Sequence, residues 1–137
     1  MEALTLGLDL LGHGNELVLV TVAAGPDPAS LAGSGHAGPD MQPEEYDKAI
    51  EQANRSADSV IDHAQEVLGI AGAQSCVLQG DPGAAICQLA TELSARAIVL
   101  GSRGRGGLKR AFLGSVSDHV VRNAPCSVIV TKGDGPR

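Results

Sequence analysis

Three glycines at fixed offsets mark a stretch of this chain that could hold an anion. They stand in the pattern Gly101-x-x-Gly104-x9-Gly114-Ser115, with an apolar run at 97–100 before them and a short helical pattern at 116–123 after them. This order predicts a strand, a glycine-rich loop and a helix start. Glycine lets backbone N–H groups approach a ligand closely, and the first turn of a helix offers unpaired donors at the positive end of its dipole. Phosphate binding is the chemistry that these residue types support.

Basic side chains gather on the same stretch. No Asp or Glu occurs between positions 93 and 117, which hold five of the chain's ten basic residues: Arg96, Arg103, Arg105, Lys109 and Arg110. An arginine can donate two parallel hydrogen bonds to phosphate oxygens. The alternative is a solvated loop that is basic by chance, but the glycine spacing favours phosphate contact.

Length and composition predict one domain, 1–137, built around one core. The 137 residues include a single Tyr and a single Phe, so Leu, Ile, Val and Ala must fill that core, which suits helices packed on a buried sheet. A net charge of -6 argues against nucleic acid or an anionic membrane as a partner. No apolar stretch approaches the roughly eighteen residues of a membrane span, and the start lacks the basic residues of a signal peptide. We therefore expect a cytoplasmic protein.

Residues for catalysis or for metal binding are not grouped in the sequence. The histidines are scattered and are expected at the surface, in loops and on exposed helical positions: His13, His36, His63 and His119. Cys76, Cys87 and Cys126 are widely spaced in apolar sequence, which predicts buried thiols rather than disulfides or a zinc site. The sequence thus predicts no catalytic residue and no metal site, and at most a slow, incidental hydrolysis.

The apolar periodicities predict alternating strands and helices. Strands are expected at 17–22, 75–78, 97–100 and 127–131, and helices at 43–68, 82–93 and 115–123, the last opened by a capping pair of Ser115 with Asp118. Residues 24–43, rich in Gly and Pro, are predicted to be a flexible loop. The alternation predicts an α/β fold with three layers: a doubly wound, mostly parallel sheet, its strands buried on both faces. Ligands bind at the carboxyl ends of such strands.

These motifs together resemble a known family. The glycine pattern, preceded by Gly80-Asp81-Pro82 and followed by Val116-Ser117-Asp118 and by residues 125–130, is similar to that of universal stress protein domains over residues 17–132. The resemblance implies a Rossmann-like fold of the adenine nucleotide alpha hydrolase type and a regulatory role in the stress response. It also implies a homodimer joined through the last strand, Ser127 to Thr131, and, in the nucleotide-binding branch of the family, bound ATP or AMP with or without Mg²⁺.

The resemblance also implies the residues that contact the nucleotide. Val22 would touch adenine, and Gly101 and Gly104 would lie beside the ribose and phosphates. The remaining positions, in the turn and around the phosphates, are Ser102, Arg103, Arg105, Gly114, Ser115, Val116 and Ser117. The alternative for the hydroxyls of the two later serines is helix capping.

The start of the chain departs from the family. Members open with a central strand ending in an Asp that helps to fix the adenine or ribose, followed by a helix, but only sixteen residues precede Leu17 here. Residues 3–11 are interpreted as the tail of the first helix, which we favour, or as a strand with Leu4, Leu6, Leu8 and Leu10 on one face and Asp9 near its end. Without a central strand, the sheet would expose unpaired edges, and rearranged pairing or exchange between chains is expected.

Three functions remain open at this point. The favoured one is a regulatory module that binds an adenine nucleotide. The alternative is a dimeric interaction module of the same fold without nucleotide, which the altered start favours. The third is a nucleotidyl transferase or slow ATPase.

Overall fold

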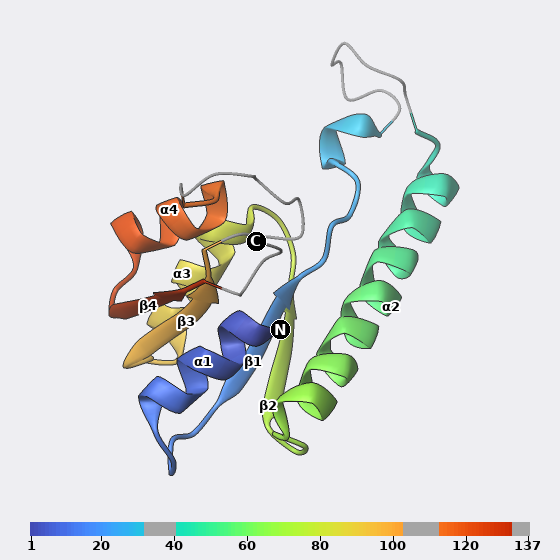
Figure 1. Cartoon of the computed structure of the whole chain (residues 1–137). Helices are drawn as coiled ribbons and strands as arrows, with labels where there is room; N and C mark the ends of the chain where they lie inside the picture. The colour runs from blue at the N-terminus through green and yellow to red at the C-terminus, as the bar shows by residue number, and fades with distance from the viewer. Residues whose placement is uncertain (32–40, 103–112, 133–137) are drawn as a thin grey trace.

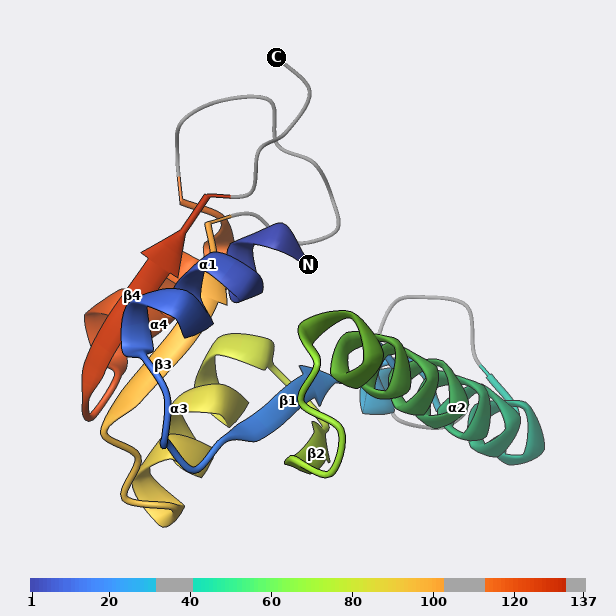
Figure 2. The same ribbon diagram turned by 60° about the horizontal axis from the view of Figure 1, so that its bottom comes forward.

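The computed structural model describes residues 1–31, 41–102 and 113–132. Strands and helices alternate along this part of the chain (Figure 1). The elements are α1 (Glu2–Leu11), β1 (Val18–Val22), η1 (Pro28–Ser30), α2 (Pro43–Leu68), β2 (Gln74–Leu78), α3 (Pro82–Glu92), β3 (Ala97–Gly101), α4 (Ser115–Asn123) and β4 (Ser127–Thr131). Helices α1 and α2 lie on one side of the strands and α3 and α4 on the other (Figures 1 and 2). The predicted three-layer α/β fold with parallel strands is confirmed.

The sheet is divided into two pairs of strands. Strand β1 pairs in parallel with β2, from Val18 opposite Gln74 to Val22 opposite Leu78, and β3 pairs in parallel with β4. In the described part of the chain no strand joins the two pairs. Figure 2 shows β2 and β4 on the outside and β1 and β3 on the inside of this arrangement. The unpaired edges expected from the altered start are present.

The inner strands are less buried than the sequence predicts. Every residue of β1 and of β3 is half-buried, so the predicted burial is incomplete although helices lie on both sides of the strands. Within the described chain each of these strands has a strand neighbour along one edge only, which leaves its other edge open. Among the described residues, the buried hydrophobic ones are few and mostly small: Ala23, Ala57, Ile61, Ala64, Ala90 and Val120.

The first segment is a helix that packs on β3 and β4. At Gly7 the helix comes so close that a Cβ built there would lie 2.2 Å from Cγ1 of Val99. The hydroxyl of Thr131 donates a hydrogen bond to the carbonyl of Ala3. The favoured helical interpretation of residues 3–11 is confirmed and the strand alternative was wrong.

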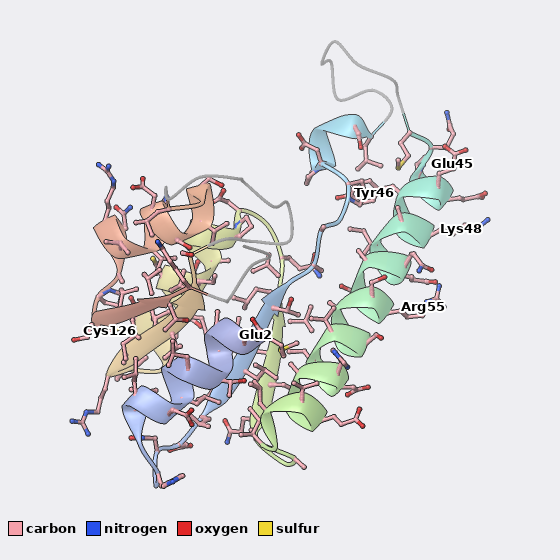
Figure 3. All side chains as sticks on the ribbon, viewed as in Figure 1. Glu2, Glu45, Tyr46, Lys48, Arg55 and Cys126 are labelled. Atoms are coloured by element: carbon pink, nitrogen blue, oxygen red, sulfur yellow. The ribbon has the colours of Figure 1, made fainter. Side chains whose placement is uncertain are left out.

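Capping residues fix the starts and ends of α2 and α3. The start of α2 has a capping box, in which Gln42 N donates to Oε2 of Glu45, labelled in Figure 3, over 3.2 Å. The sequence analysis had not found this capping box. Gly69 ends this helix with a left-handed φ of 65°. Asp81 caps α3, since its Oδ2 accepts a hydrogen bond from the amide of Ala84 over 3.0 Å.

Part of the predicted loop at 24–43 has local structure. Pro28–Ser30 form a short 3-10 helix, and Leu31 makes a parallel bridge with Met41. Residues 32–40, with His36, lie outside the described residues. Among the helices that are described, none is both long enough and apolar enough to cross a bilayer.

Candidate functional site

Hydrogen bonds hold the end of β3 against the start of α4. The amide of Gly114 donates to the carbonyl of Ser102 over 2.8 Å, and the hydroxyl of Ser117 donates to the carbonyl of Gly101 over 2.7 Å. The amide of Ser102 in turn donates to the carbonyl of Thr131 over 2.8 Å, which ties this corner to β4. Four of the predicted site residues therefore lie together at the carboxyl end of the β3–β4 pair.

The first turn of α4 presents backbone donors. Its N-cap is Gly114, and the first amide that bonds back to this residue is that of Asp118, over 2.9 Å. The amides of Ser115, Val116 and Ser117 precede it, and no acceptor for them is found in the described part of the chain. These three N–H groups and the helix dipole can stabilise an anion. The Gly114 amide is not available for that purpose, because it already bonds to Ser102.

The two serine hydroxyls of this turn have different environments. Ser117 is buried, with 3% of its surface exposed, and its hydroxyl already donates its hydrogen to the carbonyl of Gly101. Ser115 is exposed and its hydroxyl makes no hydrogen bond with any described residue. The predicted capping pair of Ser115 with Asp118 was wrong, because the N-cap of α4 is Gly114 and Ser115 is already the first helical residue. The carboxylate of Asp118 lies instead 3.0 Å from Nε of Arg122.

The structure places only some of the predicted positive charge. Arg103, Gly104 and Arg105 lie outside the described residues, as do Lys109 and Arg110. Arg96 is exposed and precedes β3, so it stands at the opposite end of a strand about 16 Å long. Arg96 therefore belongs to the basic stretch of the sequence but does not lie at the strand end that leads into the glycine-rich loop. Lys132 is an exposed basic residue at the carboxyl end of β4 that the sequence analysis missed. Its position directly after the predicted last strand could have indicated that it lies at this end of the sheet.

Val22 belongs to the other pair of strands. It ends β1, is half-buried and stands opposite Leu78. It shares the carboxyl side of the strands with Gly101, but no hydrogen bond joins it to the cluster among the described residues. Asp9 does not replace the family's aspartate, because it is exposed in α1. Asp9 lies six residues after Ala3, which is about 9 Å along the helix axis. It is therefore distant from the hydrogen bond that links Ala3 to β4.

Residues that often perform catalysis serve packing in this structure. The ring of His119 lies over Gly83, where an added Cβ would be 2.7 Å from its Cγ, so the expectation that His119 is exposed was wrong. The three cysteines are free and half-buried rather than buried. Burial raises the pKa of the Cys87 thiol, and the neighbouring Cys126 raises it further. Within the described ranges, no three His, Cys, Asp or Glu side chains form a group that could hold a metal ion.

An open cavity lies at the other end of the strands. It has a volume of about 430 Å³ and is lined by residues 15–17, which precede β1, and by residues 70–74, which end on the first residue of β2. It is therefore separate from the cluster at the start of α4. Its lining brings together no set of residues with a catalytic or phosphate-binding pattern.

Two solved structures share the fold of this chain. The universal stress protein UspA from Lactobacillus plantarum superposes with a TM-score of 0.59 and 22% identity over 83% of this chain and 74% of that one. The protein MJ0577, solved for a structure-based assignment of biochemical function, superposes with a TM-score of 0.62 and 17% identity, covering 87% and 97% of the two chains. At these identities the likeness concerns the fold alone.

Sequence comparisons identify the family. A universal stress protein in the QAH/OAS sulfhydrylase 3' region of Thermus aquaticus is 36% identical over 87 residues, which cover 64% of each chain. Universal stress protein E of Photorhabdus laumondii is 32% identical over 97 residues, 71% of this chain and 30% of its own. The matched region thus spans less than two thirds of the length of these relatives. The model of the universal stress protein family matches residues 1–132, and the chain therefore belongs to this family.

Proposed function

We propose that this chain is a regulatory module of the stress response that binds an adenine nucleotide, ATP or AMP, and has no enzymatic role. The observation that carries the proposal is the row of three amides at Ser115, Val116 and Ser117, which lack acceptors among the described residues. Membership of the universal stress protein family supports it.

In this proposal the phosphates lie on the first turn of α4. The phosphate oxygens accept hydrogen bonds from the three amides, and the exposed hydroxyl of Ser115 adds a fourth donor. Arg103 and Arg105 supply positive charge, and Gly101 and Gly104 leave room for the ribose beside the strand end. Val22 contacts the adenine from the carboxyl end of β1, and Mg²⁺ accompanies the phosphates when ATP is bound.

The proposed module acts as a homodimer in the cytoplasm. No other strand of the described residues pairs with the outer edge of β4, Ser127–Thr131, and a second copy could pair with it in the antiparallel sense that a twofold axis requires. Nucleotide binding at the start of α4 would act on this edge, because Ser102 is bonded to the carbonyl of Thr131. Neither nucleic acid nor a membrane is a proposed partner.

Isothermal titration with ATP, AMP and cyclic AMP, with and without Mg²⁺, tests nucleotide binding. We expect Ser115→Asp to lower the affinity at least tenfold, because its carboxylate would stand beside the three amides and repel phosphate. The matched control is Gln52→Glu, which adds the same charge at an exposed position on α2. No heat with any of the three nucleotides, from a folded sample, would contradict the proposal.

A dimeric interaction module without nucleotide is the second candidate. The division of the sheet favours it, as does the occupied amide of Gly114. This candidate predicts that Ser115→Asp leaves dimer formation and partner binding unchanged. A slow ATPase would instead require Mg²⁺-dependent turnover that Ser115→Ala abolishes.

A further inference from the structure

Helices α3 and α4 pack against each other on the same side of the strands (Figure 2). Each of them follows the carboxyl end of one parallel strand and leads to the start of the next, so the two helices run in the same direction, opposite to the strands. They touch near the start of α3, where a Cβ added to Gly83 would lie 2.7 Å from Cγ of His119. This contact sets how far each helix extends beside the other.

The same register brings two thiols to one end of the helix pair. Cys87 is four residues after Gly83, on the same face of α3 and one turn later. One turn after His119, α4 reaches its last residue, Asn123, and Cys126 follows just before β4, at the place labelled in Figure 3. The electrostatics agree with this placement. Burial raises the pKa of the Cys87 thiol and Cys126 raises it further, which requires the two sulfur atoms to be near each other.

The two cysteines differ in how firmly the backbone holds them. Cys87 lies within α3, whereas Cys126 lies in the turn between α4 and β4, outside both elements. A disulfide needs Cα atoms roughly 4.4–6.8 Å apart, and a turn can adjust to that distance more easily than a helix. Both thiols are half-buried and free, so a small oxidant can reach them. The third cysteine, Cys76, belongs to β2 in the other pair of strands.

We propose that Cys87 and Cys126 form a reversible disulfide when the chain meets a hydroperoxide. The Cys126 thiolate attacks the outer peroxide oxygen, the O–O bond breaks, and the sulfur becomes a sulfenic acid while hydroxide or alkoxide leaves and takes up a proton. Cys87 then loses its proton, its sulfur attacks Sγ of Cys126, and the sulfenic hydroxyl leaves as water. The two thiols lose two electrons and the hydroperoxide gains them. A dithiol or glutathione reverses the bond.

The order of the two steps follows from the environment of Cys87. A thiolate, and not a thiol, attacks a peroxide. The raised pKa of Cys87 keeps its thiol protonated, which assigns the first attack to Cys126 and the second to Cys87. The bond would connect α3 to the end of α4 and close a loop that contains β3 and α4. This proposal is independent of nucleotide binding.

Peptide mapping of the unaltered full chain tests the pairing. The chain is treated with hydrogen peroxide, the remaining thiols are blocked with iodoacetamide, and the digest is analysed by mass spectrometry without reduction. We expect a peptide pair linked through Cys87 and Cys126 as the main product, with Cys76 alkylated, at a rate that does not change with protein concentration. A main product linked through Cys76, a link between two chains, or a sulfinic acid at Cys126 without a link would overturn the proposal.

Three serine variants separate the roles of the cysteines. Cys87→Ser should accumulate a sulfenic acid at Cys126 that dimedone labels, because no second thiol is near. Cys126→Ser should give at least tenfold less dimedone label at Cys87. The matched control is Cys76→Ser, which should form the disulfide at the rate of the parent chain. Equal labelling in Cys87→Ser and Cys126→Ser would refute the proposed order, and slow disulfide formation in Cys76→Ser would refute the pairing.

Thermal unfolding shows whether the bond fits the folded chain. A disulfide that closes a loop in its native geometry restrains the unfolded state, so the unfolding midpoint of the oxidised parent should rise by at least about 5 °C and return on addition of dithiothreitol. Peroxide should not raise the midpoint of Cys87→Ser. A lower midpoint in the oxidised parent would show that the bond forms only in a distorted chain, and would overturn the proposal.

Discussion

At the scale of single residues, the hydroxyl of Ser117 links the two elements of the candidate site. It is buried and donates to the carbonyl at the end of β3. This bond fixes where the first turn of α4 stands relative to Gly101, and therefore where the three amides are presented. Ser115, two residues earlier, is exposed and is available to a ligand. The two serines thus have different roles in the same turn.

Replacement of each serine by alanine should separate these roles. Ser117→Ala removes a buried hydrogen bond, and we expect the free energy of unfolding to fall by about 1 kcal/mol. Ser115→Ala removes an exposed hydroxyl without a partner in the described chain, and stability should stay within about 0.5 kcal/mol. Urea unfolding followed by circular dichroism measures both. Equal stability of the two variants would show that the Ser117 bond contributes nothing.

The thiol of Cys87 should react slowly and should make stability depend on pH. Its pKa is raised in the folded chain, first by burial and then by Cys126, so the folded state keeps the proton to higher pH than the unfolded state. Its contribution to stability is complete below the ordinary pKa of a thiol and is lost as the pH rises through the raised value. We expect slower alkylation by iodoacetamide at pH 8 in the folded chain than in urea. Equal rates would contradict this.

At the scale of elements, α1 shows why one sequence pattern can be compatible with both a helix and a strand. Leucines at every second position satisfy the period of a strand, and the same segment also satisfies that of a helix. The structure selects the helix through a tertiary contact, the close approach of Gly7 to Val99, which no local pattern encodes. The other helices have caps and a single period, so the sequence predicted them with nearly correct bounds. The start of α4 was placed correctly, but its cap was assigned one residue late.

A double substitution tests the contact beneath α1. Gly7→Ala favours the helix by roughly 1 kcal/mol through propensity, but its Cβ would overlap Cγ1 of Val99, and we expect a net loss of about 1–3 kcal/mol. In a Val99→Ala background the obstructing methyl is absent, since the Cβ of residue 99 lies 3.6 Å away. The same glycine change should there be neutral or stabilising. An equal loss in both backgrounds in thermal unfolding would contradict the contact.

At the scale of the whole molecule, the sequence predicted the layers and the parallel strands but not how well the sheet is covered. Apolar β-branched runs such as β1 are typical of buried strands, and the pattern does not reveal whether a neighbour occupies each edge. The site was likewise predictable in part. The glycine spacing marked the strand end and the helix start, whereas the bond from Ser117 to Gly101 depends on how α4 packs on β3. Arg96 is close to the loop in the sequence but lies before β3, at the other end of that strand. Sequence proximity to a loop does not indicate at which end of a strand a residue lies.

The proposed homodimer through β4 can be tested with a single proline. Val128 points away from β3, so its amide lies on the open outer edge. Val128→Pro should leave the β3–β4 pair intact and weaken a dimer formed along this edge at least tenfold. Ser75→Pro, on the outer edge of β2, is the matched control and should dimerise normally. Sedimentation equilibrium measures both, and a monomeric parent chain would contradict the proposed dimer.

The bond from Thr131 to Ala3 has a consequence for biosynthesis. It joins residues 128 positions apart, and α1 rests on strands that the ribosome makes much later than the helix itself. Helix α1 must therefore wait for its docking surface, and high sequence separation of contacts slows folding. During that delay the leucines of α1 that are half-buried in the folded chain, Leu4, Leu8 and Leu11, are apolar surface that a nascent-chain chaperone would recognise.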